Sequence, residues 1–312
     1  MYSDIIIFRR IQPSSAGSEY LISCGYKVFS VKTRFKWLYL FLRVFHKFKP
    51  YSAFLAKLFW KIDVKLLSKA TMIIVFDAGI DYYFCSFIQR YFSNKKLILN
   101  YWNKIDTVKE REINHYKPFW DIFSFDINDC RKYQLKYNKM FISMPNNFSD
   151  LIKLKIQQDV FFVGKNKGRA DKIMKIKYEF DKLGITYKII CTGADKYSNQ
   201  GIQTKRIPYN EVLIENMKSR AILDINYNDM YGQTLREIES LSLNRKLITD
   251  NIFVKERDYY NPDNVYIIDY SRPDFLEGIK DFLEKPCVPI DENILKSYSV
   301  ESWIQRFTEQ NK

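Results

Sequence analysis

Short apolar segments of five to eight residues recur along the chain, separated by stretches with helical periodicity. The pattern predicts a first series of strands at 4–8, 26–31, 72–77, 96–102, 121–126 and 140–144, and a second series at 159–164, 187–193, 220–227, 246–251 and 265–269. Continuously apolar strands that alternate with amphipathic helices are typical of parallel sheets covered on both faces. Because 312 residues are comfortable for two cores, we expect an α/β fold with two Rossmann-like domains facing a central cleft.

The domain boundary is predicted near residue 150. Residues 1–150 would form an N-terminal Rossmann-like domain, and residues 151–290 a C-terminal one. Residues 291–312 are expected to form a helix that packs back toward the first domain, with Trp303 and Phe307 among its apolar contacts. Folds of this kind bind ligands at the carboxyl ends of their strands, so functional side chains should follow strands.

The stretch at 231–251 combines a glycine turn, a capped helix and a buried strand. Thr234 followed three residues later by Glu237 fits a capping box, so a helix should begin just after Thr234 with free amide groups. Gly232 permits a tight turn before it. Arg236 places a cation where the helix dipole favours an anion, which suggests a bound phosphate. The alternatives are a helix that binds nothing and an Arg236 paired with a surface carboxylate.

A second basic loop, KNKGRADK, follows the predicted strand at 159–164. Gly164 and Gly168 give the loop conformational freedom, while Lys165 and Arg169 bring positive charge to the start of the next helix. A glycine loop with cations at a helix N-terminus is a plausible phosphate cradle. The alternative is a solvated lysine-rich loop, and the sequence matches neither a Walker A loop nor G-x-G-x-x-G.

In the first domain, Asp77 and Asn103 each end a predicted strand and are expected to face the cleft. A carboxylate there could accept a proton from an acceptor hydroxyl. Asp77 and Glu19 are therefore candidate catalytic bases, and Asn103 is placed on the acceptor side. The alternatives are that Asp77 and Asn103 cap helices and that Glu19 lies in solvent.

The net charge of +14 is concentrated in the first half of the chain. Residues 1–150 contain 24 basic against 12 acidic residues, and between Lys27 and Lys69 eleven basic residues accompany one acid. This segment is rich in Trp, Phe and Leu, but its longest apolar run falls far short of the roughly 20 residues that a membrane span needs. An anionic bilayer surface suits it, with Arg34, Lys36, Arg43, Lys47 and Lys49 facing the membrane. Two ordinary helices with exposed lysines are the alternative, and nucleic acid is not expected because no nucleic-acid module accompanies the charge.

The rare residue types exclude several kinds of site. Five scattered cysteines without a Cys-x-x-Cys, two histidines and no Asp-x-Asp argue against a disulfide framework, a zinc site, a Ser-His-Asp triad and a metal-bound diphosphate. No secretory signal is recognised at the start. We therefore expect no metal and no cofactor other than a co-substrate, and a cytoplasmic location.

From Asp159 to Asn251, the succession DVFFVGKNKGR, IPYNEVLIENMKSRAILDIN and YGQTLREIESLSLNRKLITDN resembles the donor half of bacterial GT-B-fold nucleotide-sugar glycosyltransferases, especially those of lipopolysaccharide and capsule biosynthesis. A weaker likeness covers FDAGI and LNYWNKI in the first domain. The resemblance implies that Glu239 holds the donor ribose. It also implies that the amides of Gly232, Gln233 and Thr234 meet the diphosphate, together with Arg169 and Lys165.

The resemblance has one clear departure, because retaining members often carry a second glutamate where this chain has Tyr231. The leading hypothesis is a metal-independent glycosyltransferase. It would move a sugar from a nucleoside-diphosphate sugar to a lipopolysaccharide, capsule or lipid-linked acceptor, peripherally bound to the inner face of the cytoplasmic membrane. The alternatives are a nucleotide-sugar epimerase of the same fold and a non-catalytic basic protein that binds anionic polysaccharide or membrane.

Overall fold

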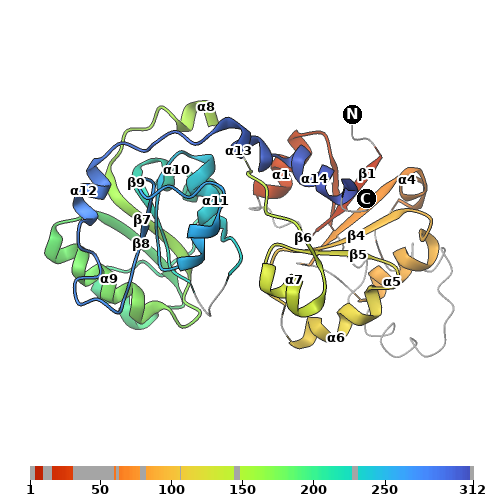
Figure 1. Ribbon diagram of the computed structural model, residues 1–312, viewed down its shortest axis with the longest axis horizontal. Helices are drawn as coiled ribbons and strands as arrows, with labels where there is room; N and C mark the ends of the chain where they lie inside the picture. Colours follow the sequence, from red (N-terminus) through yellow and green to blue (C-terminus); the bar gives the residue numbers. More distant parts are fainter. Residues whose placement is uncertain are drawn as a thin grey trace. The chain divides into compact units, whose positions relative to one another are not determined.

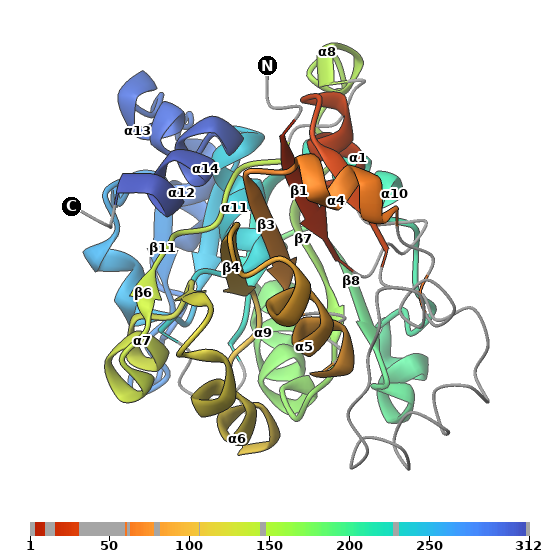
Figure 2. The ribbon, with the colours of Figure 1, turned by 90° about the vertical axis from the view of Figure 1, so that its right-hand side faces the viewer.

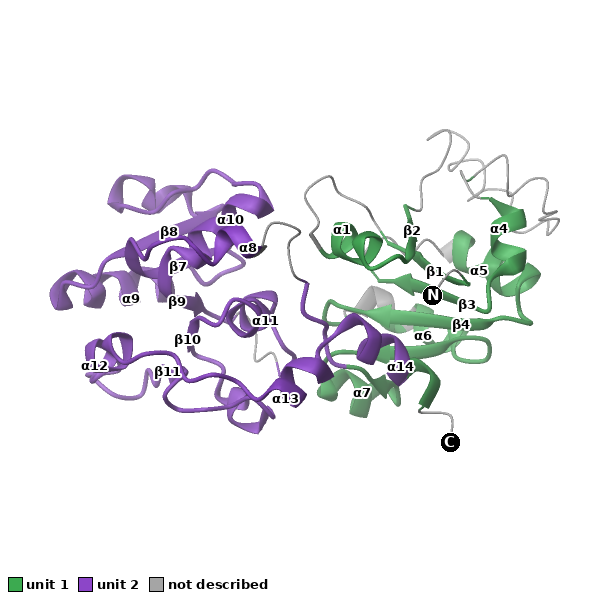
Figure 3. Ribbon diagram, turned by 90° about the horizontal axis from the view of Figure 1, so that it is seen from above, with its two compact units in different colours: residues 1–138, 307–312 green, residues 139–306 purple. Residues whose placement is uncertain are grey.

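The chain divides into two compact units in the computed structural model (Figure 3). Residues 1–138 and 307–312 make up unit 1, and residues 139–306 make up unit 2. The structure describes residues 4–9, 16–30, 60, 63–77, 82–105, 107–143, 148–226 and 231–309. The five basic residues predicted to face a membrane lie outside these ranges.

Unit 1 is built on a parallel sheet of six strands, in the order β2-β1-β3-β4-β5-β6. Figure 1 labels β1, β4, β5 and β6 of this sheet. Its elements are β1 (Ile5–Phe8), α1 (Ala16–Ser23), β2 (Lys27–Phe29), α4 (Val64–Lys69), β3 (Met72–Phe76), α5 (Tyr82–Tyr91), β4 (Lys96–Tyr101), α6 (Thr107–Tyr116), β5 (Asp121–Ser124), α7 (Ile127–Tyr133) and β6 (Lys136–Tyr137). The first five predicted strands of this series are thereby confirmed to within a few residues.

Both faces of this sheet are buried, as the continuous apolar runs predict. One face packs against α4, α5 and α6 through a core that includes Phe8, Val75 and Leu99. Figure 2 shows β1, β3 and β4 side by side in this sheet. On β5, Phe123 packs against Phe307 at 4.8 Å between ring centroids, so the end of the last helix belongs to this unit.

Unit 2 repeats the plan with a parallel sheet of five strands, in the order β11-β10-β9-β7-β8. Its elements are α8 (Phe148–Leu151), β7 (Gln158–Lys165), α9 (Ala170–Leu183), β8 (Tyr187–Thr192), η2 (Asp195–Gln200), α10 (Tyr209–Met217), β9 (Ser219–Asp224), α11 (Leu235–Ser242), β10 (Lys246–Thr249), η3 (Ile252–Glu256), β11 (Val265–Ile267), α12 (Ile279–Glu284), α13 (Glu292–Ser297) and α14 (Val300–Glu309). All five strands of the second predicted series are confirmed.

The α9 helix illustrates how the sequence sets these elements. Ile173, Ile176 and Phe180 recur at helical spacing and are fully buried against the sheet. The helix ends at Gly184, which adopts a left-handed conformation with φ of 65°. The opposite face of the sheet packs against α10 through Val212.

In both sheets the first strand lies next to a strand from the other half of its domain. In unit 1, β1 pairs with β2 on one side and with β3 on the other. In unit 2, β7 pairs with β8 on one side and with β9 on the other. All strands are parallel, and it is the strand order that reverses at these points, which are where doubly wound sheets bind ligands.

The predicted strand at 140–144 is wrong, since the described residues 140–143 form no strand. These apolar residues are buried for another reason. Phe141 packs against Trp303 of α14 at 5.0 Å, and the amide of Ile142 donates to the carbonyl of Tyr298. The segment is therefore a connection that docks on the C-terminal helices. Within the described part of the chain, no helix combines the length and apolar character of a membrane span.

Candidate functional site

The start of α11 has the capped geometry that the sequence predicts. Thr234 is the N-cap, its hydroxyl accepts from the Glu237 amide (3.1 Å), and the Glu237 carboxylate accepts from the Thr234 amide (3.3 Å). The amides of the next two residues, Leu235 and Arg236, donate to no described residue. Because Leu235 is exposed, this end of the helix offers donors to a ligand.

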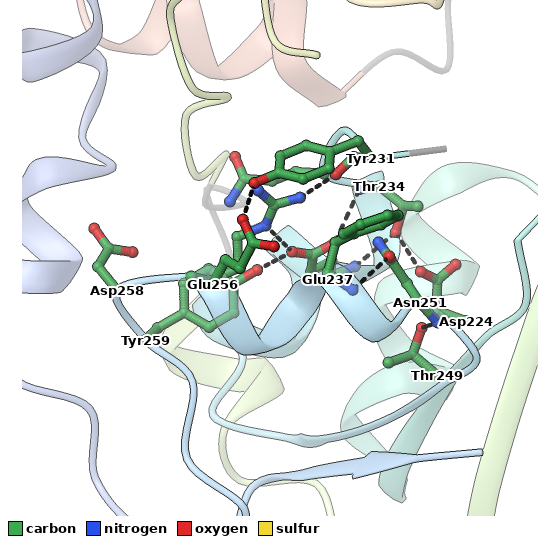
Figure 4. A network of polar contacts seen from close by, with 12 residues as sticks. Asp224, Tyr231, Thr234, Glu237, Thr249, Asn251, Glu256, Asp258 and Tyr259 are labelled. Carbon is green, nitrogen blue, oxygen red and sulfur yellow. Dashed lines mark hydrogen bonds and ion pairs between the residues drawn. The ribbon is translucent and has the colours of Figure 1, made fainter. Parts of the chain in front are cut away.

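Asp224, at the carboxyl end of β9, holds this turn in place. Its carboxylate is completely buried, accepts from the Thr234 hydroxyl (2.9 Å), and forms an ion pair with the Arg236 guanidinium (2.7 Å). Figure 4 shows the side chain of Asp224 facing Thr234. Arg236 also donates to the carbonyl of Val163 at 3.0 Å. The carboxylate pairing considered for Arg236 thus exists, with a buried partner in place of a surface one, and a phosphate contact by Arg236 stays a prediction.

Arg169, the N-cap of α9, lies beside Arg236 near Gly164 of β7. It is buried, and its guanidinium donates to the carbonyl oxygens of Lys165 (3.0 Å) and Ile225. The guanidinium carbons of both arginines lie over the ring of Phe162, at 5.2 and 5.4 Å. The two cations meet at the switch point between β7 and β9.

Gly164 makes this arrangement possible. A Cβ atom there would come within 3.3 Å of the Arg236 guanidinium and closer still to that of Arg169. Only glycine leaves room for both side chains. Gly168 has φ of 85°, a conformation that side chains rarely adopt, so it sets the turn into α9. Lys165 is exposed.

Glu237 has a role beyond its predicted cap. It is 1% exposed and accepts from Arg257 (3.2 Å) and from the Tyr259 hydroxyl. Figure 4 shows its carboxylate pointing toward Tyr259. Burial raises the pKa of Glu237, and the charge of Arg257 opposes that rise. Arg257 donates to the Tyr231 carbonyl as well, so this network ties the loop before α11 to η3.

Glu239, the predicted ribose ligand, is 4% exposed and faces α10. Asn216 donates to its carboxylate at 3.0 Å, and Tyr209 also hydrogen-bonds it. Burial raises the pKa of Glu239 to about 7, a rise that these two donors limit. Contact with a ribose stays a prediction.

The remaining predicted donor residues lie around the same turn. Gly232 and Gln233 are buried, and Gln233 donates to the Tyr298 hydroxyl at 3.1 Å. Sequence reasoning missed Asp224, Arg257 and Tyr259, although an acidic residue inside the mostly apolar predicted strand at 220–227 was a usable signal.

Two of the predicted acceptor-side residues meet in unit 1. The Asp77 carboxylate accepts from the Asn103 amide (2.9 Å) and from the backbone amide of Trp102 (3.0 Å). Asp77 is buried and Asn103 is exposed. Glu19 is exposed in the first turn of α1, and none of the hydrogen bonds just described involves it.

Sequence reasoning also missed Arg9, at the end of β1. Its guanidinium carbon lies 5.0 Å from the Phe76 ring centroid and 5.6 Å from that of Trp102. Burial lowers the pKa of Arg9 to about 10, and the nearby Asp77 charge opposes the shift. Arg9 and Asp77 therefore stand on neighbouring strands at the switch point of this sheet.

The described residues contain no cluster of three or more His, Cys, Asp or Glu side chains suited to a metal ion.

No protein-family model matches the sequence, and no curated protein is significantly similar to it. Solved structures do match. A glycosyltransferase from Rickettsia africae ESF-5 shares 9% identity over 98% of this chain and 96% of its own, with a TM-score of 0.52.

A second match is AviGT4, a glycosyltransferase involved in avilamycin A biosynthesis. It shares 8% identity over 98% of this chain and 96% of its own, with a TM-score of 0.51. The chain has the GT-B fold. The two Rossmann-like domains confirm the fold class that the sequence predicts. Sequence identity this low establishes the fold alone.

Proposed function

We propose that this protein is a glycosyltransferase that moves a sugar from a nucleoside-diphosphate sugar to a lipopolysaccharide, capsule or lipid-linked glycan acceptor. The observation that carries the proposal is the cluster at the switch point of unit 2. There the guanidinium groups of Arg169 and Arg236 meet over Gly164, and the exposed start of α11 offers unshared amide donors. The shared fold with two glycosyltransferases supports the same reading.

In this proposal, unit 2 holds the donor. The α11 amides and the exposed Lys165 contact the diphosphate, and Arg169 and Arg236 add positive charge behind them. A departing diphosphate gains negative charge in the transition state, which fixed donors and cations stabilise without reorganisation. These groups would take the part that a divalent metal plays in other transferases, so transfer is proposed to be metal-independent. Glu239 would accept a hydrogen bond from a ribose hydroxyl.

Unit 1 is proposed to hold the acceptor, with Asp77 as the base. Its carboxylate is oriented by the Trp102 amide and the Asn103 side chain, which hold it at the end of β3. Asp77 is preferred to Glu19 because Asp77 is fixed at the end of a strand. The basic segment between Lys27 and Lys69 is proposed to bring the protein to the inner face of the cytoplasmic membrane.

The test is release of nucleoside diphosphate from a panel of nucleotide sugars, with and without polysaccharide acceptors and with a chelator present. The proposal expects release that depends on an acceptor and persists with chelator. An epimerase would instead convert one nucleotide sugar into another without acceptor, and a non-catalytic protein would do neither. Loss of transfer on chelation, restored by a divalent metal, would contradict metal independence.

A further inference from the structure

Buried polar groups without partners gather at the carboxyl edge of the unit 1 sheet. The Nη1 atom of Arg9 is buried and has no hydrogen-bond partner among the described residues. The same holds for both polar atoms of the Asn100 side chain, which is 1% exposed. Buried polar groups are nearly always hydrogen-bonded, so these groups need a partner from outside the described chain.

These two side chains lie on one face of the sheet. On β4, Leu99 and Tyr101 belong to the apolar core on the α5 side, so the intervening Asn100 faces the other way. Asn100 is the register partner of Phe76, and the Phe76 ring contacts both Arg9 and Trp102. Arg9 and Asn100 therefore flank the same ring.

The local field favours an anion at this place. Arg9 lies against the first turn of α1, where a Cβ on Gly17 would stand 2.8 Å from Nη1. A cation at the positive end of a helix is unfavourable unless an anion compensates it. Asp77 acts on Arg9 electrostatically, since its charge opposes the fall in the pKa of Arg9 that burial causes. Arg9 as a whole residue is partly exposed, while its Nη1 atom is buried.

We infer that Arg9 and Asn100 form a binding site for the anionic group of a sugar acid or sugar phosphate, at the switch point between β1 and β3. The neighbouring Asp77 carboxylate repels polyanions, which favours a ligand with one anionic group and several hydroxyls. The exposed Asn103 amide is placed to bind one of those hydroxyls. That this ligand is the acceptor rests on the proposed function, whereas the anion site itself does not.

The site is tested by ligand-observed NMR titration of the whole protein with glucuronate, glucose 6-phosphate and neutral glucose. The first two probes distinguish a carboxylate from a phosphate ligand. Loss of a charged hydrogen bond should weaken the preferred anionic probe about 10-fold or more in Arg9→Gln. The matched control is Arg90→Gln, which removes the same charge from the exposed end of α5 in the same unit and should leave binding unchanged.

Gly17→Ala provides a second variant that keeps the charge. The added methyl displaces the end of the Arg9 side chain, while alanine is more favourable than glycine within a helix, so the protein should remain folded. We expect the same loss of anion binding as in Arg9→Gln. Unchanged binding in both variants would overturn the inference, and so would binding of glucose as tight as that of the anionic probes or no binding of either anion.

Nucleoside-diphosphate affinity separates this site from the donor site. It should be unchanged in Arg9→Gln, and a loss there with intact sugar-acid binding would assign Arg9 to the donor and overturn the inference. Anion binding that persists in a protein without transferase activity would count against the proposed function only.

Discussion

Replacing Arg257 by methionine tests how much the buried ion pair with Glu237 stabilises the network that ties the loop before α11 to η3. The Arg257 side chain is 8% exposed and that of Glu237 1%, with 3.2 Å between the Nε and Oε1 atoms. Removing one partner of a buried pair leaves an uncompensated charge, which costs about 3–5 kcal/mol. Since Tyr259 and the Thr234 amide still donate to the carboxylate, we expect the free energy of unfolding to fall by about 3 kcal/mol, near the lower end of that range.

The loss should depend on pH with a defined sign. The folded-state pKa of Glu237 is already raised, and without Arg257 it should rise further. When the carboxyl pKa is higher in the folded state, stability is full at pH values below the unfolded-state pKa and is lost as pH rises through the folded-state pKa. The Arg257→Met loss should therefore be smaller at pH 6 than at pH 8.

Urea unfolding of the wild type and variant at both pH values measures these changes. The control is the double variant Arg257→Met/Glu237→Gln, in which the amide removes the buried charge but keeps an acceptor oxygen. It should be more stable than Arg257→Met at pH 8. The reasoning would be refuted if the free energy of unfolding fell by less than about 1 kcal/mol, which is the range of an exposed ion pair. An equal loss at both pH values would refute it as well.

Four further predictions concern the site and the membrane. The free energy of unfolding of the wild type should fall by about 2–3 kcal/mol as pH rises from 5 to 8, because the pKa of Glu239 is raised to about 7. Glu239→Gln should abolish this pH dependence, and an equal pH dependence in both proteins would contradict the prediction. Glu239→Ala should weaken nucleoside-diphosphate-sugar binding in calorimetry by about 1–3 kcal/mol, because it removes the acceptor for a ribose hydroxyl, and unchanged affinity would remove Glu239 as the ribose ligand. Asp77→Asn should lower kcat about 10²- to 10⁴-fold with donor affinity intact, and near-normal turnover would remove Asp77 as the base. Neutralising basic residues between Lys27 and Lys69 should weaken sedimentation with anionic vesicles in a salt-sensitive way, whereas unchanged binding would leave the segment without a membrane role.

Local patterns predicted the framework well, because the signals lie within a few residues of one another. The Thr234–Glu237 capping box and the Gly184 helix stop both depend on neighbours in sequence, and both are confirmed. The apolar run at 140–144 resembled a strand, yet its burial comes from Trp303, far along the chain. Periodicity alone does not distinguish a buried strand from a buried connection.

Side-chain partners were less predictable because they are set by the fold. The sequence singled out Arg236 for its position in the first turn of a helix, but its partners Asp224 and Val163 come from two strands of the sheet. Arg9 carries no sequence signal that separates it from the other basic residues of the first half. Its significance depends on strands β1, β3 and β4 meeting at one edge, which only the topology reveals.

Hydrogen–deuterium exchange with and without nucleoside diphosphate, in the presence of a chelator, tests the central claim most directly. If backbone amides and cations of unit 2 hold the diphosphate, a nucleoside diphosphate from the panel should protect the amides of residues 164–169 and 231–237. The sheet edge around Asp77 should show no comparable protection. Protection confined to unit 1, or no protection with any nucleoside diphosphate, would contradict the account.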